Sequence, residues 1–358
     1  MNPKTRGGNF FEDFKVGQLF RHAVPRTVTE GDLALYIALT GDRRALHCSR
    51  EFARSLGFER ELAHDLLVFH IVFGRAVPDV SLNSPANLGY ADVRFMATVY
   101  PGDTLRAETE VIGRRETSRP DVGIVWVHTR GFNQRDEVVL QFYRWAMVNK
   151  RDPATSSGSD DAPELPQQVS VDNLLVPPAL DLSRFDPVAT GGAHFWEDYQ
   201  PGERIVHPQG MTIEDAEHQM ATRLYQNNAR VHFNDLLQKK SKLGRRIIYG
   251  GHIISVAHAI SFDGLENAIR VLAFNAGSHA NPTVGGDTLF AWTEVLERID
   301  LGRSDAAALR LRLVGVKNLD PNEEHVDLKV RDGEGGREQY HPNVVLDLDY
   351  TVLMPKRS

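Results

Sequence analysis

Two stretches of the chain carry the same ordered series of segments, separated by an offset of 185 residues. The matching pairs are FFEDFKVGQ (10–18) with FWEDYQPGE (195–203), TVTE (27–30) with TIED (212–215), and YPGDTLRAETEVI (100–112) with GGDTLFAWTEVL (285–296), the last pair with a one-residue adjustment. Similarity in this order is not expected by chance, and an internal repeat constrains the architecture of a chain before any local pattern does. The chain is therefore predicted to contain two copies of one structural unit.

The segment that joins the two copies has a different composition. Residues 152–187 are rich in Pro, Ser and Asp and show little periodicity, which is typical of an extended linker. Within this segment, VDNLLVPPALDL (171–182) carries apolar residues that a free linker does not need, so this part is expected to pack. We predict a first unit at 1–150, a linker at 151–192 and a second unit at 193–358.

Each copy is expected to contain a short helix, a loop, a strongly apolar helix and then several strands. The apolar helices are DLLVFHIVFGRAV (65–77) and GGHIISVAHAISF (250–262), which are apolar on nearly every side, as a helix inside a domain is. Among the strands, LRLRLVGV (309–316) alternates apolar and basic residues, which indicates an antiparallel sheet with one solvated face. A buried helix wrapped by an antiparallel sheet, present twice, predicts the α+β class.

Charge and composition argue against several classes of protein. A formal net charge of −7 at pH 7 does not fit a general nucleic-acid-binding protein, which normally has a basic excess. The one cysteine, Cys48, cannot form an internal disulfide and fits a reducing compartment. The N-terminal segment lacks the apolar stretch of a signal peptide, and the longest apolar run, residues 66–73, is too short to cross a bilayer. A cytoplasmic protein without a membrane segment is expected.

The segment YIALTGDRRALHCSREFA (36–53) resembles the signature of the MaoC-type (R)-specific enoyl-CoA hydratase family. That signature has an aromatic residue, a small residue, Gly-Asp, any residue, Asn-Pro, an aliphatic residue and His. Over nearly its full length the chain is similar to the mesaconyl-CoA hydratase branch of this family. The segments that carry this similarity are RTVTEGD (26–32), VPDVSLNSPANLGYADVRF (77–95), VYPGDTLRAETEVIG (99–113), LYQNNARVHFN (224–234), YGGHIIS (249–255) and NAGSHANPT (275–283).

The resemblance implies a double hot-dog fold, in which each unit rolls a long helix in an antiparallel sheet. It also implies a hydratase (a lyase) that adds water reversibly to the C=C bond of an enoyl-CoA thioester, with mesaconyl-CoA and β-methylmalyl-CoA as the expected pair. No cofactor is implied beyond the CoA that carries the substrate, and we find no convincing metal-ligand spacing. A hot-dog acyl-CoA thioesterase and a non-catalytic acyl-CoA-binding protein are the alternatives. A homo-oligomer of double hot-dogs stays open, because the repeat already supplies a pseudo-dimer.

Hydration of such a bond needs a base for the water, an acid for the α-carbon and donors for the developing enolate oxygen. In the family an Asp and a His hold the water, and a backbone N–H at the start of the buried helix faces the thioester oxygen. Asp42 and His47 match this pair in the first copy, but Arg44 and Ala45 replace Asn-Pro. Asp65 stands where the family has a glycine at the helix start, and a carboxylate there is unfavourable beside an oxyanion.

The second copy keeps a complementary part of the motif. His232 matches His47 at the offset of 185, while Asn227 stands at the position of the aspartate. An amide can orient a water molecule but cannot accept its proton. Gly250 and Gly251 retain the glycine opening of the buried helix, which permits close approach of the backbone to a ligand.

Neither copy therefore contains the complete motif. We favour Asp42 and His47 as the acid–base pair, because only the first copy provides a carboxylate. A site in the second copy, with a base from elsewhere, is the alternative. Arg44 or Arg230 is expected to bind the free carboxylate of a mesaconyl group, since a guanidinium forms paired hydrogen bonds with a carboxylate.

Overall fold

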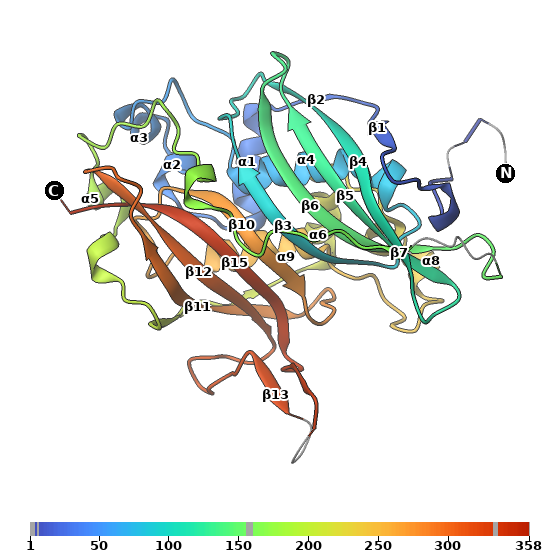
Figure 1. Ribbon diagram of the computed structural model, residues 1–358. Helices are drawn as coiled ribbons and strands as arrows, with labels where there is room; N and C mark the ends of the chain where they lie inside the picture. Colours follow the sequence, from blue (N-terminus) through green and yellow to red (C-terminus); the bar gives the residue numbers. More distant parts are fainter. Residues whose placement is uncertain (1–3, 6, 155–159, 332–335, 358) are drawn as a thin grey trace.

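The computed structural model describes residues 4–5, 7–154, 160–331 and 336–357 (Figure 1). The first copy of the repeat contains η1 (Phe11–Asp13), β1 (Leu19–Arg21), β2 (Arg26–Thr27), α1 (Glu30–Thr40), α2 (Ala45–Cys48), α3 (Arg50–Ser55), α4 (Asp65–Val80), β3 (Ala86–Phe95), β4 (Thr104–Glu116), β5 (Val122–Phe132) and β6 (Val138–Asn149). The second copy contains η3 (Trp196–Asp198), β8 (Arg204–Val206), β9 (Met211–Thr212), α6 (Asp215–Tyr225), α7 (Arg230–Phe233), α8 (Asp235–Gln238), α9 (Gly250–Ile260), β10 (Arg270–His279), β11 (Thr288–Ile299), β12 (Ala306–Lys317), β13 (Lys329–Arg331), β14 (Glu338–Tyr340) and β15 (Val344–Pro355). Apart from the small β13–β14 hairpin, the two copies follow the same element order.

Within the described residues, thirteen strands form one antiparallel sheet. Its order is β1-β4-β5-β6-β3-β10-β15-β12-β11-β8, with β2, β7 (Asp160–Asp161) and β9 paired at its margins. This order is symmetric about the β3–β10 pair, where Val93 lies opposite Phe274. The repeat read from the sequence is thus a repeat of topology, and a strand pair joins its two copies into one continuous sheet.

The two long apolar helices occupy the interior of this sheet. The first, predicted at 65–77, extends to Val80 as α4 and packs on β4, β5 and β6. The second, predicted at 250–262, ends at Ile260 as α9 and packs on β11, β12 and β15. Nearly every residue of both helices is buried, which is why their sequences lack a polar face. The α+β class is confirmed.

Helices of the two copies also contact one another across the centre of the molecule. Tyr36 of α1 donates a hydrogen bond to the Ser255 hydroxyl of α9 over 2.9 Å, and His70 of α4 lies 2.7 Å from the same hydroxyl. All three side chains are buried. Side chains of the first copy therefore contact the buried helix of the second copy directly.

The joining segment packs in part, as its apolar residues predict. It contains η2 (Val171–Asn173) and α5 (Pro187–Thr190), and Leu174, Leu180 and Leu182 are buried in a cluster with Phe52 and Ala306. The proposed boundaries at residues 150/151 and 192/193 stay predictions. In the described part of the chain, no helix has the length and apolar character needed to cross a bilayer.

Candidate functional site

A cavity of about 260 Å³ lies between the two copies. The first copy contributes side chains from α4, from residues 84–87, and from the facing strands β3 and β6. The second copy contributes Asn227, Ala229, Val231 and His232, the start of α9, and residues 279–283 at the end of β10 and just after it. Three of the predicted site residues, Asn227, His232 and Gly250, line this cavity.

His232 is held in one orientation by the backbone of its own unit. Its Nδ1 lies 2.9 Å from the carbonyl oxygen of Ile247. Because a carbonyl oxygen only accepts hydrogen bonds, Nδ1 carries the ring proton and Nε2 carries the lone pair. Burial lowers the pKa of His232 to about 4, so the ring is neutral at pH 7. A neutral imidazole with a free Nε2 lone pair can act as a general base.

Asn227 lies beside His232 and presents an unused donor. It follows Gln226, the C-cap residue of α6, which adopts the left-handed conformation with φ of 52°. The Asn227 Oδ1 accepts a hydrogen bond from the Ala229 N–H over 3.1 Å, and its buried Nδ2 has no partner among the described residues. The amide can therefore donate a hydrogen bond to a water or a substrate oxygen in the cavity.

The start of α9 supplies backbone donors at the same place. Within the described parts of the chain, no side chain caps α9, so its first N–H groups carry unsatisfied partial positive charge. A Cβ at Gly250 would lie 2.5 Å from the ring of His279, which only glycine avoids. Gly251 is buried under the Tyr249 ring and does not line the cavity. Gly250 thus lets the His279 ring pack against the start of α9 in the wall of the cavity.

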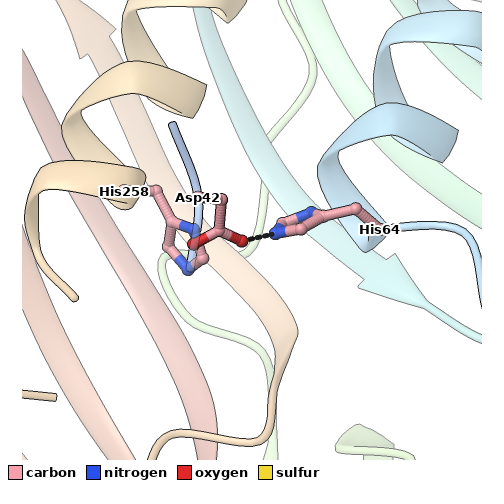
Figure 2. A group of neighbouring side chains, drawn as sticks. All are labelled: Asp42, His64 and His258. Carbon is pink, nitrogen blue, oxygen red and sulfur yellow. Dashed lines mark ion pairs between the residues drawn. The ribbon is translucent and has the colours of Figure 1, made fainter. Parts of the chain in front are cut away.

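The motif of the first copy is closed by side chains from both copies. Asp42 is 3% exposed, and its Oδ1 accepts a hydrogen bond from Arg44 Nη1 over 2.7 Å. Its Oδ2 lies 2.9 Å from His64 Nε2, with His258 of α9 on the other side (Figure 2). Burial alone would raise the pKa of Asp42, but Arg44 and His64 outweigh it and hold that pKa well below the ordinary value.

His47 and Asp65 are engaged in the same closed region. The His47 ring centroid lies 4.2 Å from that of His64, and burial lowers the pKa of His47 well below its ordinary value. Asp65 forms a buried ion pair with Arg270 of the second copy. The sequence assigned Asp65 to the thioester-binding region, but its carboxylate serves this ion pair. Neither His47 nor Asp65 lines the cavity between the copies.

The two arginines expected to bind substrate also lie outside the cavity lining. Arg44 is buried, and besides Asp42 it donates to the His258 carbonyl over 3.0 Å and to Ser261 Oγ over 3.2 Å, so both of its terminal nitrogens are engaged within the protein. Arg230 is exposed, and its Nη1 lies 3.3 Å from Asn83 Oδ1. A carboxylate-binding role for Arg44 is therefore at odds with its contacts.

Asp42, His64 and His258 bring three potential ligand atoms within 4.8 Å of one another (Figure 2). The Leu66 N–H donates to His64 Nδ1 over 3.0 Å, so Nε2 holds the ring proton and has no lone pair for a cation. Arg44 already neutralises the Asp42 carboxylate. The donor set therefore does not fit a metal ion, although three such residues meet here.

The polar residues of the cavity lining that sequence reasoning missed include Tyr90, Arg144 and His279. A signal for Arg144 is present in VVLQFYRWAMV (138–148), where it falls in phase with Phe142 and the other inward-facing residues of β6. Tyr90 lies directly opposite Arg144 on β3. No sequence pattern marks His279, because its place in the cavity wall depends on a tertiary contact with Gly250 at the start of α9.

Comparison with known proteins agrees with this architecture. The family described as "Mesaconyl-CoA hydratase" matches residues 2–321. The chain belongs to this family. It is 52% identical over 359 residues, all of both chains, to "Beta-methylmalyl-CoA dehydratase" of Chloroflexus aurantiacus. It is 48% identical to "Mesaconyl-CoA hydratase" of Cereibacter sphaeroides, over 99% of this chain and 100% of that protein.

The fold agrees with that of solved structures. A crystal structure of a MaoC domain protein from Chloroflexus aurantiacus, 52% identical, covers 99% of both chains with a TM-score of 0.94. The double hot-dog arrangement implied by the resemblance is confirmed. This member of the mesaconyl-CoA hydratase family is thus an enzyme of the hydratase class whose two motif regions differ, one closed by side chains and one open to a cavity.

Buried histidines are expected to make the fold less stable in acid. Burial lowers the pKa of His207, His232 and His279 to about 4, whereas 6.5 is the ordinary value. Between these values the unfolded chain binds more protons than the folded one, so the free energy of unfolding decreases as the pH falls. Urea midpoints at pH 7.5, 6 and 5 should decrease in that order. His207→Gln should reduce this dependence, and equal midpoints at pH 7.5 and 5 would contradict the expectation.

Proposed function

We propose that this chain reversibly adds water to the C=C bond of mesaconyl-CoA to form β-methylmalyl-CoA, at the cavity lined by the second copy of the motif. The names of the family and of its full-length relatives support the reaction and the substrate. The observation that carries the location is the free Nε2 lone pair of His232 in a cavity that also holds the start of α9.

In the proposed reaction, one imidazole serves both proton transfers. His232 Nε2 takes a proton from water as the water oxygen bonds to the β-carbon, and the C=C electrons move toward the thioester oxygen. The imidazolium then returns this proton to the α-carbon as the C=O bond reforms. Water is consumed whole and the ring ends neutral, so a neutral imidazole can start each turnover.

Two neighbouring groups have distinct parts in this proposal. The free Nδ2–H of Asn227 orients the water, which suits a donor that has no partner in the described part of the chain. The backbone N–H groups at Gly250 stabilise the oxygen that becomes negative during the addition. A well-placed donor of this kind contributes on the order of 3 kcal/mol to the transition state. No carboxylate base is required in this scheme.

The first copy supports the fold in this proposal and does not bind substrate. The Asp42 carboxylate is bound to Arg44. Asp65 stands at the start of α4, where a thioester oxygen would have to approach the helix. An enolate oxygen beside Asp65 would meet a like charge. The sequence-based preference for Asp42 and His47 is therefore replaced by His232, Asn227 and Gly250.

The direct test is incubation of the purified chain with mesaconyl-CoA. Absorbance of the conjugated enoyl thioester should fall, and mass spectrometry should identify a hydrated thioester. A thiol-reactive dye in a parallel sample should detect no free CoA, since thiol release is the signature of a thioesterase. If the protein consumes none of the three thioesters mesaconyl-CoA, crotonyl-CoA and itaconyl-CoA, the proposed function is overturned. Tight binding without turnover would favour an acyl-CoA-binding protein.

A further inference from the structure

Arg144 is a buried cation in the cavity wall. It lies on β6, in phase with the inward-facing residues of that strand, and its side chain is fully buried. It lines the same cavity as His232 and Gly250. A guanidinium at an inward position of a strand is costly, because burial removes the hydration of its charge.

Only one nitrogen of this guanidinium forms a hydrogen bond with the described residues. Arg144 Nη1 donates to Ser81 Oγ over 3.3 Å, and its Cζ lies 4.2 Å from the centroid of the Phe73 ring. Its Nε and Nη2 have no hydrogen-bond partner among the described residues, and no carboxylate there forms an ion pair with it. Burial lowers the pKa of Arg144 to about 10, so the group stays charged at pH 7.

Two other arginines with very little exposed surface have the carboxylate partner that Arg144 lacks among the described residues. Arg44 is paired with Asp42, and Arg270 is paired with Asp65. Both of these arginines lie in the closed region and have a protein carboxylate. Arg144 lies in the wall of the cavity between the copies, with two buried donor nitrogens unused by the described residues. A guanidinium in this state is suited to an anion that arrives with a ligand.

We propose that Arg144 binds the free carboxylate of the acyl group, so that the cavity selects monothioesters of unsaturated dicarboxylic acids. The proposal rests on the proposed function and adds the basis of its substrate choice. In a mesaconyl thioester the free carboxylate sits on the carbon that water attacks. An anchor at this carboxylate therefore also fixes the reacting carbon relative to His232.

The test compares mesaconyl-CoA with 2-methylcrotonyl-CoA, in which a methyl group replaces the carboxylate. Wild-type protein should hydrate mesaconyl-CoA with the larger kcat/KM. Arg144→Gln should lower kcat/KM for mesaconyl-CoA about 100-fold, because it removes one partner of a buried charge pair. Activity of this variant on 2-methylcrotonyl-CoA should stay the same or rise. Arg130→Gln, on the adjacent strand β5 and outside the cavity lining, is the matched control and should change neither value.

Failure of this inference differs from failure of the proposed function. If wild-type protein hydrates neither thioester, the proposed function fails. If it hydrates mesaconyl-CoA but Arg144→Gln loses both substrates equally, or if wild type uses both equally well, only the role of Arg144 is wrong. Should Arg144→Gln not fold, inhibition of wild type decides: succinyl-CoA should inhibit more strongly than butyryl-CoA, and equal inhibition overturns the inference.

Discussion

Replacing His232 by glutamine is expected to lower kcat/KM for hydration of mesaconyl-CoA by about 100-fold or more. Glutamine keeps a polar side chain of similar length but has no group that accepts a proton from water. General-base catalysis by a positioned side chain typically contributes two to four orders of magnitude. Steady-state kinetics on the enoyl absorbance measures the effect, and the loss should appear mainly in kcat, because the residue acts on the water.

The repeat provides a matched control for this experiment. His47→Gln makes the same change at the equivalent position of the first copy, where the ring is packed on His64 and lines no part of the cavity. This variant is expected to lose stability and to retain kcat while folded. If His47→Gln abolishes turnover and His232→Gln does not, the working site lies in the first copy, as the sequence alone had favoured.

Replacing Asp42 by asparagine is expected to lower the free energy of unfolding by about 3–5 kcal/mol, because it leaves the buried Arg44 charge without its partner. Asp42 and Arg44 are 3% and 2% exposed, so water cannot compensate for the lost carboxylate. Urea denaturation at pH 7 measures the change. Turnover of the folded fraction should persist, since the carboxylate faces Arg44 and His64 and lines no part of the cavity.

A double variant tests the cause of this loss. Asp42→Asn combined with Arg44→Met removes both charges, and the pair should recover part of the stability that Asp42→Asn alone loses. Additive losses would mean that the ion pair is not the reason for the effect. An Asp42→Asn protein that is as stable as wild type yet inactive would instead identify Asp42 as a catalytic carboxylate.

Much of the fold was accessible from the sequence because it depends on local patterns and on their repetition. The 185-residue offset predicted two copies, and the apolar stretches at 65–77 and 250–262 became the buried helices α4 and α9. Period-two alternation predicted the antiparallel strands. Family resemblance added the double hot-dog arrangement and the reaction class, and the comparisons bear out both.

Each motif occupies a short stretch of chain, residues 42–47 in the first copy and 227–232 in the second, so its residues are close in space wherever the segment lies. Asn227, His232 and Gly250 line the same cavity. Asp42 and His47 each contact the ring of His64. A short segment of sequence cannot reveal whether a cavity lies next to its side chains. That property depends on side chains that arrive from elsewhere in the chain.

Only the tertiary structure decided which motif is open. His258 and Arg270, supplied by the second copy, close the region around Asp42 and Asp65, while the first copy lines the other cavity with Phe73, Tyr90 and Arg144. These partners lie far apart in sequence and meet because β3 pairs with β10 and the helices of the two copies share one core. Local sequence determines which chemical groups each copy carries, but the packing of one copy against the other determines whether those groups are buried or face a ligand.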